Sequence, residues 1–137
     1  MKKNVLLIGI GPHAKRIYIN YLKTHRVNLK LVVELESNKD KTIEYLNQQG
    51  FVKTKLLFLP DEYKDNKHLP CHIFIELKKI CEELDINHIM ISTEPKAHYM
   101  YIEFALQNNI NVLTDKPITA NREMFSKLGA SEIKTDY

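Results

Sequence analysis

The sequence contains no tryptophan, and it has only two cysteines and four glycines among its 137 residues. Cys71 and Cys81 are too few for a disulfide-rich scaffold, and their spacing is not one that ligates zinc. We therefore expect no metal site, and this cysteine usage fits a reducing cytoplasm best. Because glycine is so scarce, each glycine is informative about the backbone where it occurs.

Long hydrophobic runs are missing too. No apolar stretch approaches the ~20 residues that a membrane-spanning helix requires. The apolar run at residues 5–8 is too short for the core of a secretory signal, and no small-residue cleavage site follows it. Like charges form no block, since 20 basic residues are interspersed with 17 acidic ones and the net charge is +3. We therefore expect no membrane partner and no nucleic-acid partner.

Short apolar runs alternate with stretches of helical spacing along the chain. The apolar runs predict strands over residues 5–8, 29–34, 55–59, 87–93 and 111–114. The spacing predicts helices over residues 12–25, 40–49, 73–84 and 97–108. The inward face of the first helix is predicted to comprise Ala14, Ile17, Tyr18, Tyr21, Leu22 and His25.

This order of elements predicts an α/β fold of the Rossmann type. Right-handed crossovers between the strands give a three-layer, doubly wound parallel sheet with helices on both faces. We assign residues 1–125 to an NAD(P)-binding domain of this kind, and residues 126–137 to a truncated C-terminal tail that supplies no last strand. Ligands of such sheets bind beyond the carboxyl ends of the strands, so the residues after each strand form the candidate site.

A glycine-rich turn follows the first strand. Gly9, Gly11 and Ala14 fit the spacing G-x-G-x-x-A between a strand and a helix. The first glycine permits a tight turn, the second lets a pyrophosphate approach the backbone, and the small third residue lets helix and strand pack closely. Since Pro12 lacks an N–H, His13 and Ala14 are expected to donate to the phosphates. The turn predicts dinucleotide binding, with a purely structural turn as the alternative.

An acidic residue ends the second strand. Glu34 follows the turn at the spacing where a carboxylate accepts hydrogen bonds from the ribose hydroxyls of adenosine. Its charge repels a 2′-phosphate, which favours NAD over NADP. Glu36 is a competing candidate, Lys39 would attract a 2′-phosphate, and either glutamate is otherwise a solvated strand-end residue. We expect NAD as the cofactor, and NADP is not excluded.

Two further segments complete a recognisable series. Residues 92–98 read Ser-Thr-Glu-Pro-Lys-Ala-His, and residues 111–119 include Asp115-Lys116-Pro117. With the glycine turn and Glu34, the series resembles the glucose–fructose oxidoreductase / inositol dehydrogenase / rhizopine catabolism (Gfo/Idh/MocA) family from about residue 4 to residue 119. In that family the fourth strand ends in a Thr-Pro turn followed by a histidine, and the fifth ends in Glu-Lys-Pro. Here Glu94 replaces the proline and Asp115 replaces the glutamate.

The resemblance implies an oxidoreductase that moves hydride between a nicotinamide and a hydroxyl-bearing carbon of a sugar, an inositol or a related polyol. It also implies a catalytic role for Lys116, whose ammonium would orient the substrate hydroxyl and lower its pKa. A cis bond between Lys116 and Pro117 is compatible with the motif. The residues implied to line the cofactor are Thr93, Pro95, His98, Asp115, Lys116 and Pro117.

Members of the family continue into a second domain that completes the substrate pocket, whereas this sequence ends at Tyr137. We expect that the substrate domain is absent and that the chain alone does not catalyse. The leading interpretation is the N-terminal part of a dehydrogenase. A second is a stand-alone module that senses NAD(H) or partners another subunit, with apolar surface available for a homo-oligomer. A third is a methyltransferase, against which the motif at residues 115–117 argues.

Overall fold

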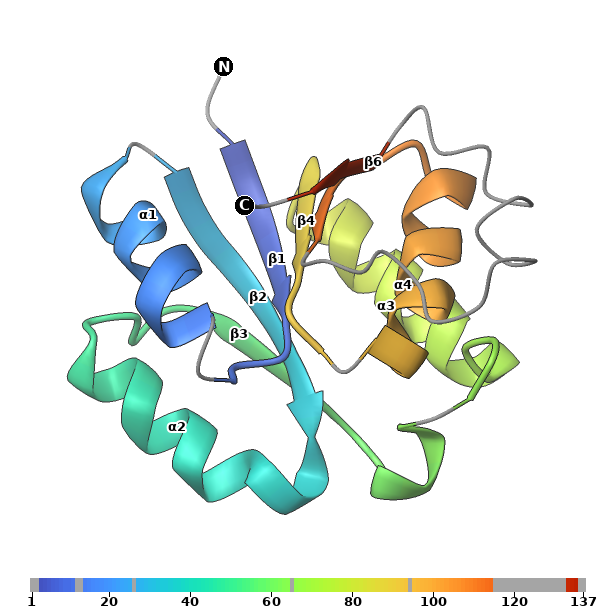
Figure 1. The fold of residues 1–137 in the computed structure, drawn as a ribbon, viewed down its shortest axis with the longest axis horizontal. Helices are drawn as coiled ribbons and strands as arrows, with labels where there is room; N and C mark the ends of the chain where they lie inside the picture. The colour runs from blue at the N-terminus through green and yellow to red at the C-terminus, as the bar shows by residue number, and fades with distance from the viewer. Residues whose placement is uncertain are drawn as a thin grey trace.

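The computed structural model describes residues 3–11, 14–25, 27–64, 66–93, 95–114 and 133–135. Its centre is a sheet of six parallel strands in the order β3-β2-β1-β4-β5-β6 (Figure 1). The strands are β1 (Lys3–Ile8), β2 (Val27–Leu35), β3 (Lys55–Leu59), β4 (His88–Ile91), β5 (Asn111–Thr114) and β6 (Ile133–Thr135). The strand order reverses between β1 and β4, which confirms the predicted doubly wound α/β fold.

Helices cover both faces of the sheet. One face carries α1 (Ile19–Thr24) and α2 (Lys39–Gln48), and the other carries α3 (Cys71–Glu83) and α4 (Pro95–Gln107) (Figure 1). Three short turns accompany them, namely η1 (Ala14–Tyr18), η2 (Glu36–Asn38) and η3 (Asp61–Tyr63). Within the described ranges no helix has the length and apolar character that crossing a bilayer demands.

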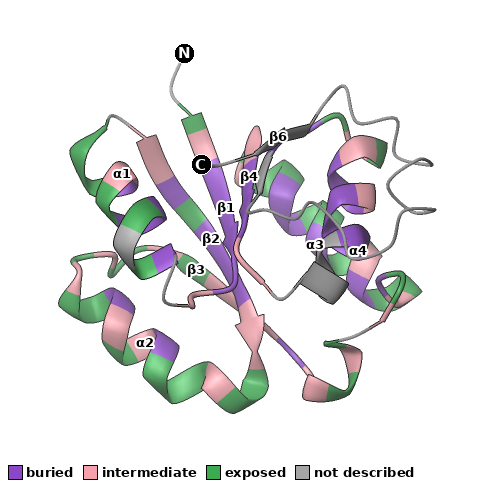
Figure 2. Ribbon diagram, in the orientation of Figure 1, coloured by how far each residue is buried: buried purple, intermediate pink, exposed green. Residues whose placement is uncertain are grey.

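The central strand β1 is buried on both sides (Figure 2). Val5 and Leu7 pack into the core beneath α1 and α2, whereas Leu6 and Ile8 pack into the larger core beneath α3 and α4. None of these four side chains is more than 1% exposed. A continuous apolar run is therefore what this position requires, because alternating polarity would bury a polar side chain on one of the two faces.

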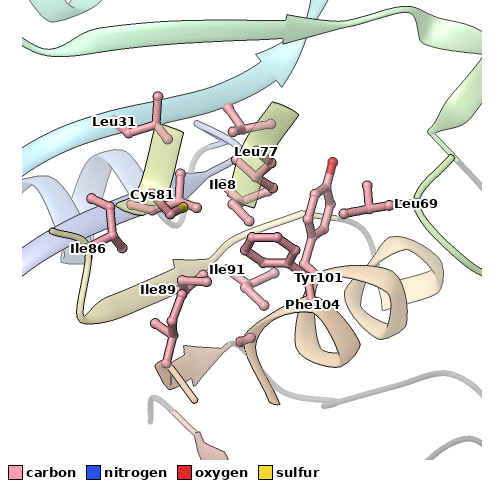
Figure 3. Close-up of a cluster of buried hydrophobic side chains, with 14 of the residues drawn as sticks. Ile8, Leu31, Leu69, Leu77, Cys81, Ile86, Ile89, Ile91, Tyr101 and Phe104 are labelled. Atoms are coloured by element: carbon pink, nitrogen blue, oxygen red, sulfur yellow. The ribbon is translucent and has the colours of Figure 1, made fainter. Parts of the chain in front are cut away.

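The later helices present the faces that their spacing predicts. Phe104 (Figure 3) and Ala105 of α4 are fully buried. The Phe104 ring meets Phe74 of α3 edge to face at 5.2 Å between centroids. Asn109 follows α4 with φ 55°, and Gly50 follows α2 with φ 89°. Both residues take the left-handed conformation that commonly ends a helix.

The first helix differs from its prediction. Its opening turn, η1, is π-helical, and the wider i to i+5 turn rotates the residues that follow relative to a regular α-helix. Ile19 is buried in place of Ile17, which is 44% exposed. His25 is exposed as well and stacks on the Tyr21 ring at 4.0 Å. The predicted inward positions of Ile17 and His25 were therefore wrong.

The C-terminal tail does contribute a strand. Residues Ile133–Thr135 form β6, which pairs in parallel with β5 at the edge of the sheet. The expectation that residues 126–137 supply no last strand was therefore wrong. A run of three residues, Ile-Lys-Thr, is too short to show a period, and only its partner strand identifies it as β structure.

Candidate functional site

A cavity of about 430 Å³ opens where the carboxyl ends of β1, β2 and β4 meet. This is the edge at which a doubly wound sheet binds ligands, beside the point where the strand order reverses. The cavity brings together segments that are far apart in the sequence. Its lining includes Gly9, Ile10, Gly11, Glu34, Asn38, Lys64, Ser92, Thr93 and Tyr101.

Gly9 makes the tight turn at the end of β1. Its φ is 84°, and its N–H donates to the Val33 carbonyl at 2.9 Å. A Cβ atom on this residue would lie 2.9 Å from the Ser92 carbonyl oxygen and 3.0 Å from Cγ2 of Thr93. Both the left-handed conformation and the close approach of β4 therefore require glycine here.

Gly11 faces open space. No heavy atom among the described residues lies within 4 Å of the position that its Cβ would take, and the residue lines the cavity. Ala14, the small third member of the motif, is fully buried against β1. Pro12 and His13 lie outside the described residues. The turn thus leaves its backbone accessible to a ligand at Gly11 and packs the helix closely at Ala14.

Glu34 reaches across the glycine turn from the end of β2. Its Oε2 accepts a hydrogen bond from the Ile10 N–H at 2.8 Å. Its Oε1 accepts from the Leu35 N–H at 2.9 Å and from the Asn38 side-chain amide at 3.4 Å. Because a carboxylate offers about four acceptor positions, Oε2 keeps one for a ligand hydroxyl. The arrangement holds a half-buried acceptor at one end of the cavity.

The structure separates the candidates that the sequence left open at this end. Glu36 lies in η2, is exposed and does not line the cavity. Lys39 is also outside the cavity lining, and its Nζ lies over the Phe58 ring at 5.8 Å. Glu34 is therefore the acidic side chain that faces this cavity from the segment between residues 34 and 40.

Asn38, Lys64 and Tyr101 are among the lining residues that the sequence did not assign to the site. Asn38 bonds Glu34, and Lys64 comes from the loop after η3. Tyr101 of α4 is buried in the core, and it lines the cavity as well. The only sequence signal for Lys64 is its place downstream of a strand's carboxyl end.

The opposite end of the cavity holds part of the second motif. Thr93 lines this end. The helix α4 begins at Pro95, and its first turn contains Ala97 and His98. The β5 strand ends at Thr114, opposite Ile91 of β4, so its carboxyl end lies at this same edge of the sheet. Asp115, Lys116 and Pro117 lie outside the described residues, and the predicted role of Lys116 stays a prediction.

Burial sets the protonation of two groups, the Tyr101 hydroxyl at the cavity and the Cys81 thiol elsewhere in the core. Desolvation raises the pKa of the Tyr101 hydroxyl, and the nearby Glu34 carboxylate raises it further. Desolvation also raises the pKa of the Cys81 thiol to about 12, with a smaller contribution from Glu82. Both groups are therefore neutral near pH 7. Within the described parts of the chain, no three His, Cys, Asp or Glu side chains gather to hold a metal ion.

The chain matches a family model described as "Oxidoreductase family, NAD-binding Rossmann fold" over residues 3–136. No curated protein matches the sequence. The family match covers the glycine turn, Glu34 and the segments after β4 and β5.

Solved structures share the fold. Myo-inositol dehydrogenase from Lactobacillus casei, in complex with NAD(H) and myo-inositol, has a TM-score of 0.69 at 17% identity, with 98% of this chain and 36% of that chain covered. Apo scyllo-inositol dehydrogenase from the same organism has a TM-score of 0.65 at 16% identity, with 98% of this chain and 36% of that chain covered. A 3-ketoreductase from Actinomadura kijaniata, in complex with NADP and TDP-benzene, has a TM-score of 0.63 at 15% identity, with 95% of this chain and 34% of that chain covered. The chain thus spans about a third of the length of these proteins.

Proposed function

Because the chain belongs to the oxidoreductase family with an NAD-binding Rossmann fold, we propose that it is the cofactor-binding part of a dehydrogenase that acts on CH–OH groups. The substrate class is a sugar, an inositol or a related polyol. Support for this class comes from the two inositol dehydrogenases among the structural neighbours. The family match also favours a dinucleotide over S-adenosylmethionine, which a methyltransferase would bind.

The position of Glu34 is the observation that carries the proposal. Its carboxylate faces the cavity next to the Ile10 N–H, and it accepts hydrogen bonds there without a cationic partner among the described residues. Hydroxyls of an adenosine ribose are neutral donors that suit such an acceptor, whereas a 2′-phosphate would meet its negative charge. We therefore assign NAD as the preferred cofactor, although the 3-ketoreductase among the neighbours is solved with NADP.

The glycine turn suits the phosphates. Gly11 offers backbone with no side chain in the way, and the space beside it is open. Phosphate oxygens accept from backbone N–H groups at such a strand-to-helix turn, and the positive end of the following helix favours their charge. Pro12, His13 and Ala14 complete this assignment by their place in the motif, with His13 and Ala14 as the N–H donors.

The other end of the cavity is assigned to the nicotinamide, which accepts or donates the hydride when bound. Thr93 lines this end, and Pro95 and His98 follow it at the start of α4. Asp115 and Pro117 frame Lys116, whose ammonium would orient the substrate hydroxyl and stabilise the charge that develops on its oxygen. We propose that the reaction also needs chain beyond this sequence, since the solved enzymes are about three times as long.

Titration with NADH and NADPH, followed by nicotinamide fluorescence, tests the cofactor assignment. We expect saturable binding of NADH, weaker binding of NADPH, and loss of both in Gly11→Val, because the isopropyl group would fill the space that the phosphates need. Gly50→Asn is the matched control, since Gly50 ends α2 away from the cavity and asparagine tolerates its φ of 89°. Wild-type protein that binds neither nucleotide would contradict the proposal.

A further inference from the structure

Tyr101 joins the hydrophobic core to the cavity. It lies in α4, is 3% exposed, and belongs to the larger core cluster together with Leu69 and Leu77. Figure 3 shows the side chain extending from α4 with its hydroxyl oxygen at the end away from the helix. The same residue lines the cavity that Glu34 and Lys64 also line. A residue that is almost wholly buried therefore presents a polar atom to the candidate site.

The hydroxyl of Tyr101 has no hydrogen-bond partner among the described residues. By contrast, every side-chain nitrogen or oxygen that is fully buried in this part of the chain has a hydrogen-bond partner. The hydroxyl is therefore not fully enclosed, and the space it meets is the cavity. A phenylalanine would fill the same volume without leaving a polar group unsatisfied. The hydroxyl oxygen therefore does not stabilise the core, and we look for its binding partner in a ligand of the cavity.

The protonation state of the hydroxyl is fixed by its surroundings. Burial and the Glu34 carboxylate both raise its pKa above the ordinary value of a tyrosine, so near pH 7 it carries its proton and can donate. Glu34 has its carboxylate oxygens at the same cavity and can only accept. Lys64 adds a cation to the lining. One end of the cavity thus pairs a neutral donor with an anionic acceptor.

We propose that Tyr101 is a cofactor-binding residue, whose hydroxyl donates a hydrogen bond to the adenosine half of the dinucleotide. Adenosine fits both groups, because its ribose hydroxyls donate to a carboxylate and its ring nitrogens and ribose oxygens accept from a phenol. Tyr101 and Glu34 line the same cavity, so one adenosine can meet both groups. This inference rests on the proposed function and extends it to a residue outside the glycine and acidic motifs.

Tyr101→Phe tests the inference, because it removes one oxygen and keeps the ring. We expect the Kd for NADH to rise about three- to tenfold, the value of one net hydrogen bond. The Kd for ADP-ribose, measured by displacement of NADH, should rise by the same factor. The melting temperature of the ligand-free protein should stay the same or rise, because the hydroxyl has no partner among the described residues.

Tyr99→Phe is the matched control. Tyr99 lies on the same helix and is 7% exposed, but its hydroxyl donates to Glu103 at 3.2 Å and it does not line the cavity. We expect this variant to bind NADH and ADP-ribose as the wild type does and to lose some thermal stability.

Three results would overturn the inference. Unchanged affinity of Tyr101→Phe for both ligands would show that the hydroxyl does not bind the cofactor. A loss for NADH without a loss for ADP-ribose would remove it from the adenosine half. A lower melting temperature of the ligand-free variant would give the oxygen a structural role. The wild-type titration comes first and tests the proposed function, which fails if the protein does not bind NADH. The variants are compared only when the wild type binds, so they test the role of Tyr101 alone.

Discussion

The glycine turn and the Glu34 end of the cavity are built in different ways. The glycine turn at residues 9–11 works through its backbone, since Gly9 has a left-handed φ of 84° and Gly11 leaves open space. The end around Glu34 works through side chains that come from four separate places, namely β2, η2, the loop after η3 and α4. The turn is therefore a local property of a few residues. The Glu34 end exists only once the whole sheet is assembled.

The largest effect is expected at the turn, in the stability of the fold. Gly9→Ala should lower the free energy of unfolding by about 3 kcal/mol, because the new Cβ meets the Ser92 carbonyl at 2.9 Å and the φ is strained for alanine. Gly50→Ala should cost only about 1 kcal/mol, because Gly50 shares the positive φ but has open space around it. Urea unfolding measures both values, and equal losses would show that the contact with β4 adds nothing.

Gly11→Ala completes this series. No described atom lies within 4 Å of its Cβ position, so the variant should stay within about 0.5 kcal/mol of the wild type in stability. Its effect should fall on NADH affinity, since the added methyl group lies where the phosphates are assigned. A variant that binds normally would place the phosphates elsewhere. The three positions thus separate three effects. Gly9 combines a steric contact with a positive φ, Gly50 has the positive φ alone, and Gly11 tests access of the ligand.

The contrast between the turn and the Glu34 end also explains what the sequence could reveal. Gly9, Gly11, Ala14 and Glu34 were found because a strand, a turn and a helix that are adjacent in the chain fix their positions. Asn38 was missed although it lies only four residues after Glu34. Lys64 and Tyr101 were not assigned to the site, since their approach depends on how β3 and α4 pack beside β2 and β4. No local pattern encodes such a long-range meeting.

The same reasoning accounts for the two errors in the fold. Helix spacing assumes a regular α-helix, and the π-helical turn at Ala14–Tyr18 broke that assumption, so Ile17 turned outward. The strand β6 was missed because Ile133–Thr135 is defined by its pairing with β5. The long elements, by contrast, followed their periodicity, as the buried faces of α3 and α4 show.

A second prediction concerns the charge at the Glu34 end. Glu34→Gln keeps the shape of the side chain but replaces an ionised acceptor with a neutral one, so NADH affinity should fall by about 2 kcal/mol, or roughly 30-fold. NADPH affinity should fall less, because the variant also removes the charge that opposes a 2′-phosphate. Glu36→Gln is the control, since Glu36 is exposed and outside the cavity. Equal losses for the two nucleotides in Glu34→Gln would contradict the assigned contact with the ribose.

The smallest effect is expected for Asn38, which acts through Glu34. Asn38 stands at the N-cap of α2, a position where asparagine commonly bonds the helix backbone, yet its side chain makes no capping bond. Its amide instead donates to Oε1 of Glu34 at 3.4 Å. Because this bond is long, Asn38→Ala should raise the Kd for NADH only about two- to threefold, and the missing cap bond means that stability should change by less than about 0.5 kcal/mol.

Asn47→Ala is the control for that variant, since Asn47 lies exposed on the same helix away from the cavity. A double variant sharpens the test. If Asn38 acts only by positioning the carboxylate, its loss should have no further effect on NADH affinity once Glu34 is glutamine, because the two changes then remove the same interaction. Additive losses would instead mean that Asn38 contacts the cofactor itself. The Glu34 end would then be a set of independent contacts, and the carboxylate would not be its organising group.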